Sequence, residues 1–286
     1  MKPFKRIYIE ITNSCNLSCG FCPGTNRALH SMDDTSFETV LSRIGNFGSY
    51  LYYHVLGEPL LHPGLGNFLD IAQGHGKFVN LVTNGTLIRE KGDALIGKPA
   101  LRQITFSLHS FCQDKKEGSS DDYIRPILLF ANKAKDFCYV SFRLWPAREN
   151  ADKKSFDSIV AAMQAFFNPA FSIAENLLSS FSVPITKNVF INQTAHFDWP
   201  DMTGKDFGPN GFCLGLREQI AILVDGTVVP CCLDRNGDMG LGNVFNEPFE
   251  TILQKPRTLD IINGFSKRMV IEPLCRHCSY RKKFDR

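Results

Sequence analysis

The 286-residue chain has almost no excess of charge of either sign. Its 32 basic and 29 acidic residues leave a formal net charge of +3. Domains that bind nucleic acid usually carry a strong, clustered positive charge, and a balance this close to neutral gives no indication of such a partner. We therefore expect no nucleic-acid ligand.

Long apolar runs are also missing. No stretch approaches the ~18 consecutive apolar residues that a membrane span needs. The start, MKPFKRIYIE, is basic but has only a short apolar stretch before Glu10, which is unlike a secretory signal. We expect a cytoplasmic protein without a membrane segment. In a reducing compartment, clustered cysteines bind metal or carry out chemistry more often than they form disulfides.

Apolar strand-like runs alternate with helix-like segments through the first two thirds of the chain. Strands are expected at residues 7–11, 50–56, 77–83, 102–108, 138–145 and 188–193. This alternation predicts an α/β fold, a partial (β/α)6 TIM-like barrel with parallel strands and right-handed crossovers. Residues 169–186 show no clear pattern. In such barrels the functional groups gather where the strands end.

Three cysteines follow the first expected strand: Cys15, Cys19 and Cys22. A disulfide uses two cysteines and a closed zinc site uses four ligands, so this spacing fits neither well. In a four-iron cluster, three thiolates leave one iron free to bind a small molecule. On spacing alone, a zinc site with a distant fourth ligand and incidental buried thiols remain alternatives.

The segment CNLSCGFC (15–22) resembles the CxxxCxΦC signature of the radical S-adenosylmethionine (SAM) enzymes, with Phe21 at the aromatic position. The resemblance covers residues 7 to about 200. It implies that Cys15, Cys19 and Cys22 hold a 4Fe-4S cluster whose open iron binds S-adenosylmethionine. It also implies reductive cleavage of that cofactor to a 5′-deoxyadenosyl radical, which abstracts a hydrogen atom from a substrate.

The same resemblance suggests further cofactor contacts at the strand ends. In place of the family's GGE motif this chain has Leu56, Gly57 and Glu58, so the first glycine is missing. A solvated strand end is the alternative for Ser107 and Arg143, and a simple Asn-Gly turn is the alternative for Asn84. The implied cofactor-binding residues are Phe21, Gly57, Glu58, Asn84, Ser107 and Arg143. His109 stands where an aspartate is common and receives no role, and His54 and His62 are expected to be structural.

A second group of cysteines follows a change in composition, and we expect a barrel domain at 1–205 and a small domain at 206–286. QIAILVDGTVVPCC predicts a hairpin that brings Cys231 towards Cys213, and PLCRHCSY adds Cys275 and Cys278. Four cysteines make a closed site, which zinc could also fill. Cys232 is the alternative to Cys231.

This second part resembles the SPASM (twitch-like) domain, which binds auxiliary 4Fe-4S clusters. The number of cysteines fits one auxiliary cluster, with Cys213, Cys231, Cys275 and Cys278 as its ligands. Cys112 and Cys138 are expected to be ordinary thiols. The alternative from another class is a non-catalytic protein, an iron-sulfur electron carrier or a zinc-stabilised binding protein.

Partners and substrate follow from weaker signals. The basic end RHCSYRKKFDR predicts docking of a flavodoxin or ferredoxin electron donor, through Arg281, Lys282 and Lys283. Similar enzymes modify peptides or dehydrogenate small molecules, so either substrate class is expected. Because the first strand begins at Ile7, we expect no fused domain for peptide recognition before it. Pocket-lining roles are expected for Gln193, His196 and Asp198.

Overall fold

Ten strands form one continuous sheet in the computed structural model of the chain, which describes residues 2–110, 120–145, 150–194, 196 and 198–284. The strands are β1 (Arg6–Ile9), β2 (Tyr50–Tyr53), β3 (Phe78–Thr83), β4 (Leu101–Ser107), β5 (Tyr139–Leu144), β6 (Ser182–Thr186), β7 (Val189–Gln193), β8 (Gln219–Ile222), β9 (Thr227–Val229) and β10 (Gly242–Asn243). Their order across the sheet is β10-β9-β8-β1-β2-β3-β4-β5-β7-β6.

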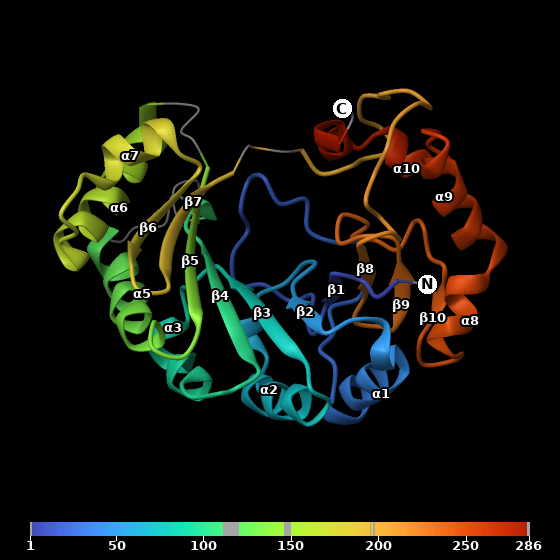
Figure 1. Cartoon of the computed structure of the whole chain (residues 1–286), viewed down its shortest axis with the longest axis horizontal. Helices are drawn as coiled ribbons and strands as arrows, with labels where there is room; N and C mark the ends of the chain where they lie inside the picture. Colours follow the sequence, from blue (N-terminus) through green and yellow to red (C-terminus); the bar gives the residue numbers. More distant parts are fainter. Residues whose placement is uncertain (1, 111–119, 146–149, 195, 197, 285–286) are drawn as a thin grey trace.

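Helices cover the outer face of this curved sheet (Figure 1). The α-helices are α1 (Asp34–Ile44), α2 (Leu65–Gly74), α3 (Ile88–Lys91), α5 (Ser120–Ala134), α6 (Asn150–Phe167), α7 (Ile173–Ser179), α8 (Phe249–Gln254), α9 (Pro256–Ser266) and α10 (Pro273–Arg276). Short 3-10 helices are η1 (Gly45–Phe47), η2 (Pro59–Leu61), η3 (Gly92–Leu95) and η4 (Ser279–Phe284). None of the helices in the described ranges is long and apolar enough to cross a membrane.

Helix α1 illustrates how the sequence builds these units. Asp33 caps its first turn, because its carboxylate accepts a hydrogen bond from the Ser36 amide at 2.7 Å. The apolar side chains recur at helical spacing, so Phe37 and Leu41 are fully buried against the sheet. Gly45 ends the helix at a φ of 40°.

The six expected barrel strands are confirmed. β1 to β5 and β7 pair in parallel, as right-handed strand-helix units require. The segment that gave no pattern contains α7 and β6, and β6 runs antiparallel to β7 as the edge of the sheet. Pro184 is tolerated in β6 because an edge strand leaves one side of its backbone unpaired.

The hairpin expected around Asp225 and Gly226 is also present, as β8 and β9. It does more than approach the cysteines, because β8 pairs in parallel with β1 from Arg6–Gln219 to Ile9–Ile222. The hydrogen-bonded sheet therefore continues from the barrel into the C-terminal region. A domain boundary at 205/206 remains a prediction.

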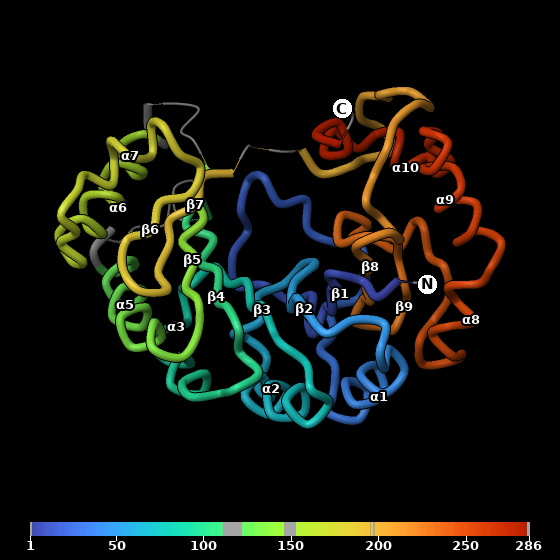
Figure 2. Tube along the Cα trace, in the orientation of Figure 1, coloured from blue at the N-terminus to red at the C-terminus, as the bar shows by residue number. Residues whose placement is uncertain are grey.

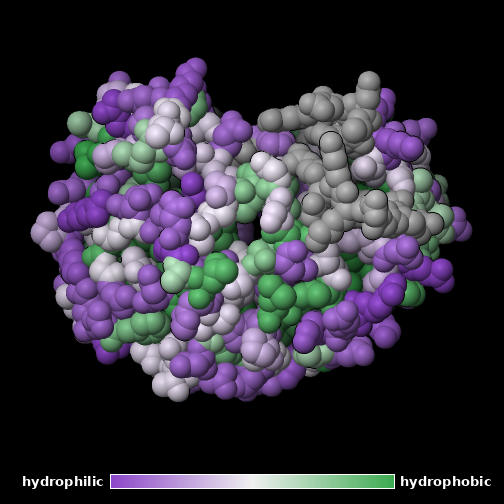
Figure 3. Space-filling view, turned by 180° about the vertical axis from the view of Figure 1, so that it is seen from behind, coloured by the Kyte–Doolittle hydropathy of each residue, from purple (hydrophilic) through white to green (hydrophobic). Residues whose placement is uncertain are grey.

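One long irregular segment lies on the inner side of the sheet. The cysteine loop, residues 13–30, is closed at its base by a bridge between Thr12 and Ser31. Figure 2 shows this dark-blue segment between the strand ends of β4 to β7 and the C-terminal region. Seen from behind, the molecule presents mainly hydrophilic side chains with scattered hydrophobic patches (Figure 3).

Candidate active site

The strand ends, the cysteine loop and the C-terminal region line a cavity of about 970 Å³. All nine residues predicted for the barrel site lie on its wall: Cys15, Cys19, Phe21, Cys22, Gly57, Glu58, Asn84, Ser107 and Arg143. Of the three predicted pocket residues, His196 and Asp198 line the cavity, whereas Gln193 does not. His54 and His109, which were given no chemical role, also lie on the wall.

The first half of the cysteine loop is held by the barrel. The Glu58 amide donates to the Ser14 carbonyl at 2.8 Å. Asn84 Nδ2 donates to Asn16 Oδ1 at 2.9 Å and lies 4.0 Å from Cys15 Sγ. Because amide donors near sulfur tune iron-sulfur sites, Asn84 is placed to act on a ligand thiolate as well as to form its turn.

Position 57 needs a glycine because the backbone there lies very close to the backbone of Thr12. Its φ is 78°, and a Cβ atom at this position would lie 2.2 Å from the Thr12 carbonyl oxygen. The residue before the cysteine loop therefore packs directly on Gly57. Gly57 also lines the cavity, and its contact with the cofactor stays a prediction.

Glu58 ties the end of β2 to the end of β3. Its carboxylate accepts from Leu60 N at 2.9 Å, Thr83 Oγ1 at 2.7 Å and Asn84 N at 2.7 Å. Burial raises the pKa of Glu58, and the three hydrogen bonds oppose that rise. The carboxylate thus positions Asn84 beside the cysteine loop.

Arg143 presents a buried cation to the cavity. Its Nη2 donates to Ser107 Oγ at 2.7 Å, while Nε is buried without a hydrogen-bond partner among the described residues. Burial lowers the pKa of Arg143. A buried guanidinium with a free donor suits a carboxylate, so this pair fits the amino-acid end of S-adenosylmethionine.

An aromatic group forms another wall, and the sequence analysis missed its centre, Trp145. The ring centroids of Trp145 and His109 lie 4.0 Å apart at 11°, and Phe21 meets Trp145 edge-on at 4.6 Å. His196 lies 4.0 Å from Trp145 on centroids. Burial and the Arg143 charge lower the pKa of His109 to about 3, so the imidazole is neutral. The signal was present in the sequence, since Trp145 directly follows β5.

The four C-terminal cysteines lie close enough to influence one another's charge. Burial raises the pKa of Cys231 well above its usual range, and the neighbouring Cys232 raises it further, as do Cys213, Cys275 and Cys278. Cys232 instead lines the barrel cavity, where Tyr8 hydrogen-bonds its thiol and burial raises its pKa to about 11. This supports Cys231 as the fourth ligand.

Four thiols can hold either of two groups. A zinc ion needs its sulfurs gathered about one point, whereas a cubane spreads its four ligands over a larger body.

One of the three charges of the basic end is buried, whereas the sequence predicted all three on a docking surface. Arg281 is only 2% exposed, and its guanidinium donates to the carbonyl oxygens of Cys275, Asn210, Phe207 and Gly208. It therefore fixes the backbone around the C-terminal cysteines. Lys282 and Lys283 are both exposed, and Lys283 also lines the cavity.

The chain thus combines a barrel with two groups of free cysteines, one of which lines the cavity. Residues 9–140 match the Radical SAM superfamily, and residues 213–279 match SPASM, an iron-sulfur cluster-binding domain. The chain belongs to the radical SAM superfamily and carries a C-terminal SPASM domain.

Curated relatives match over part of the chain. The S-adenosyl-L-methionine-dependent 2-deoxy-scyllo-inosamine dehydrogenase of Niallia circulans is 24% identical over 42% of this chain and 51% of its own length. The GTP 3′,8-cyclase of Aquifex aeolicus is 31% identical over 41% of this chain and 38% of its own. The matched segments span about half or less of these relatives.

Solved structures show the same fold over nearly the whole chain. Streptococcus suis SuiB bound to precursor peptide SuiA has a TM-score of 0.65 at 14% identity, covering 99% of this chain and 73% of its own. BtrN in an open conformation has a TM-score of 0.57 at 15% identity, covering 97% and 93%.

Proposed function

We propose that the protein reductively cleaves S-adenosylmethionine and uses the resulting radical to abstract a hydrogen atom from a peptide or small-molecule substrate. One observation carries this proposal: the three-cysteine loop and Arg143, whose buried Nε has no partner among the described residues, line the same cavity. A thiol site alone would also suit an electron carrier. A buried cation facing that site suits an enzyme with a charged ligand.

When bound, the cluster and S-adenosylmethionine supply an electron and a 5′-deoxyadenosyl radical, which is chemistry that no side chain provides. Cys15, Cys19 and Cys22 would hold the cluster. Arg143, fixed by Ser107, would bind the cofactor carboxylate. Asn84 donates towards Cys15, and Glu58 holds Asn84 in place.

The aromatic wall gives the cavity an apolar side that excludes water. Phe21, His109 and Trp145 pack ring against ring, and the neutral His109 adds no charge there. A carbon radical formed in the cavity is thereby kept from unwanted partners.

Cys213, Cys231, Cys275 and Cys278 are the proposed ligands of one auxiliary 4Fe-4S cluster, in a SPASM-like domain formed by residues 206–286. A flavodoxin or ferredoxin is the proposed electron donor. All nine described cysteines are free, which fits a protein of the reducing cytoplasm.

Two substrate classes are supported by the comparisons. The relative in Niallia circulans is named a dehydrogenase of 2-deoxy-scyllo-inosamine, and SuiB was solved with a precursor peptide. The cavity of about 970 Å³ lies at the upper end of the ~300–1,000 Å³ typical of ligand sites. It therefore suits the cofactor together with a small molecule or a single peptide side chain.

The test begins with protein reconstituted without oxygen. We expect about eight irons per chain, since each cubane holds four. Dithionite and S-adenosylmethionine should then yield 5′-deoxyadenosine, measured by chromatography. Replacing Cys15, Cys19 and Cys22 by alanine should remove about four irons and all deoxyadenosine.

Cys138→Ala is the matched control, because this thiol is buried in the core. The iron content and turnover of this variant should equal those of the parent protein. Intact clusters without deoxyadenosine would contradict the proposal and favour an electron carrier. About four irons plus one zinc would retain the enzyme but reject the auxiliary cluster.

A further inference from the structure

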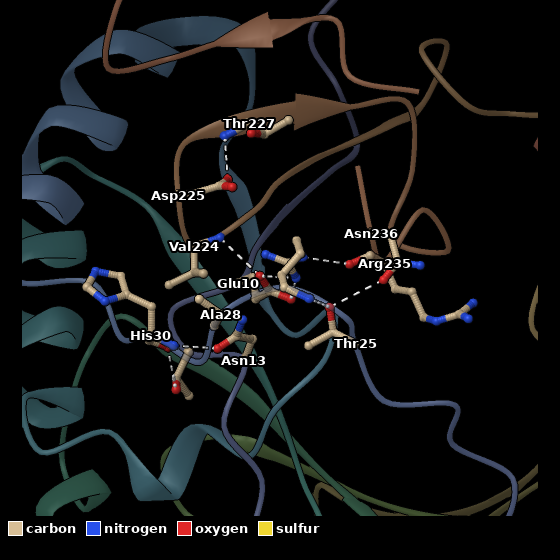
Figure 4. Close-up of polar contacts among 12 residues, drawn as sticks. Glu10, Asn13, Thr25, Ala28, His30, Val224, Asp225, Thr227, Arg235 and Asn236 are labelled. Atoms are coloured by element: carbon tan, nitrogen blue, oxygen red, sulfur yellow. Dashed lines mark hydrogen bonds and ion pairs between the residues drawn. The ribbon is translucent and has the colours of Figure 1, made fainter. Parts of the chain in front are cut away.

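The second half of the cysteine loop is held by the C-terminal region instead of the barrel. Arg235 Nε donates to the Gly24 carbonyl at 3.1 Å, and Arg27 Nε donates to the Arg235 carbonyl at 2.9 Å. Thr25 Oγ1 donates to Asn236 Oδ1 at 3.3 Å (Figure 4). Three hydrogen bonds thus join residues 24–27 to residues 235–236.

A buried ion pair anchors the same contact in the sheet. Arg27 Nη2 lies 2.7 Å from both carboxylate oxygens of Glu10, which is 0% exposed and directly follows β1. Glu10 Oε2 also accepts from the Val224 amide at 3.0 Å, at the end of β8 (Figure 4). β1, β8 and the cysteine loop therefore meet at a single carboxylate.

The other end of this contact reaches the four C-terminal cysteines. Arg235 follows Cys231 by four residues, and between them the buried Asp234 accepts from the amides of Asp238 and Met239. Met239 Sδ in turn lies 3.4 Å from Cys275 Sγ. A short run of packed, hydrogen-bonded backbone connects the four-thiol group with Arg235.

Arg235 also joins a third segment, because its Nη1 donates to the Pro200 carbonyl at 3.1 Å. Its side chain is only 13% exposed, and the bond to Pro200 is partly buried, whereas the bond to Gly24 lies at the surface. By contrast, one backbone-to-backbone hydrogen bond is described within residues 15–23, from Cys22 N to Cys19 O at 2.9 Å, beside the backbone amides of Asn16 and Leu17 that bond the Cys15 thiol. The loop's placement depends on its anchors.

We propose that Arg235, with Arg27 and Thr25, is a positioning device through which the C-terminal four-cysteine site sets the position of the three-cysteine loop. This inference rests on the proposed function, because the loop is taken to hold the catalytic cluster. Its first test measures hydrogen exchange and does not depend on activity. Occupation of the C-terminal site orders the backbone from Cys231 to Met239. That order holds Gly24 to Arg27 in place, and hence Cys22.

Hydrogen–deuterium exchange of the reconstituted chain, with its C-terminal site occupied, is the first test, because it needs no activity. Arg235→Gln should speed exchange in peptides covering residues 15–27 by about tenfold, since local opening follows the loss of its anchors. Thr25→Val removes one bond and should give a smaller increase in the same peptides. Lys255→Gln, which breaks an ion pair with Glu247 elsewhere in the C-terminal region, should leave these peptides unchanged.

The second test uses the reconstituted protein. The Arg235→Gln variant should keep its iron and make less deoxyadenosine. S-adenosylmethionine changes the electron paramagnetic resonance spectrum of the reduced N-terminal cluster, and the variant should lose most of that change. Arg235→Lys should restore part of that spectral change, because lysine can still donate to one carbonyl. Cys275→Ser with Cys278→Ser should speed exchange in residues 15–27 of reconstituted protein, and adding Arg235→Gln should add little further effect.

Unchanged exchange in Arg235→Gln would overturn the proposal, as would an equal acceleration in Lys255→Gln. Full additivity between the cysteine pair and Arg235→Gln would also reject it, because the two changes would then act separately. If the parent protein forms no deoxyadenosine, the proposed function fails. The exchange results would still decide whether the loop is positioned from the C-terminal site.

Discussion

At the scale of single residues, the approach of Gly57 to Thr12 gives the most direct prediction. Gly57→Ala should lower the free energy of unfolding by about 3 kcal/mol, from the strain of a positive φ and the clash of its Cβ with a backbone oxygen. Urea denaturation measures it. The control is Gly74→Ala, since a Cβ at Gly74 meets nothing within 4 Å. Equal effects in both variants would show that the contact does not matter.

His109 predicts how stability depends on pH. Its folded pKa of about 3 lies below the ordinary value of 6.5, so the unfolded chain binds more protons between these values. Stability should therefore be complete above pH 6.5 and fall as the pH drops through this window. The His109 share is about 2 kcal/mol between pH 7 and pH 5.

Urea denaturation of the metal-free chain at pH 7 and pH 5 measures this loss. His109→Phe keeps a ring against Trp145 but cannot be protonated, so it should show a smaller loss over the same interval. A pH dependence equal to that of the parent chain would mean that other groups, such as His54, account for it.

Arg281 was predicted to be exposed, but it is buried. A basic run near the end of a chain is normally solvated, and the sequence does not show that one of its residues donates to four backbone carbonyls. Arg281→Gln should cost about 3 kcal/mol because buried acceptors lose their donor. Lys282→Gln is the control and should change stability by less than about 0.5 kcal/mol. Thermal unfolding of both variants measures these changes in stability. An Arg281→Gln variant as stable as the parent chain would contradict a stabilising role of the buried guanidinium.

At the scale of elements, the sequence predicted the strands and helices whose apolar residues follow a regular pattern. The strands around Leu51, Leu81 and Val140 were found because buried parallel strands read as apolar runs. Strand β6 was missed because it is short and contains Pro184, and the pairing of β8 with β1 was missed because partners distant in sequence leave no local signal. The cysteines were found from their local spacing, whereas the hydrogen bonds of Arg235 join segments distant in sequence and required coordinates.

The pairing of β8 with β1 predicts the behaviour of a shortened chain. Ending the chain at residue 205 would expose the edge of β1, where four residue pairs now join it to β8. An uncovered apolar parallel edge associates with other chains, so the truncated protein should aggregate. Size-exclusion chromatography measures this. A soluble monomer that unfolds cooperatively would instead support a boundary at 205/206 between independent domains.

At the scale of the whole molecule, the cavity wall has a practical consequence. Trp145 and Trp199 are the chain's two tryptophans, and both line the cavity. Nearly all of the indole emission of the protein therefore originates beside the three-cysteine loop. Since iron-sulfur centres absorb at the wavelengths that indole emits, loading of the loop should quench the intrinsic fluorescence. The protein therefore carries an intrinsic optical reporter of cluster loading that needs no label.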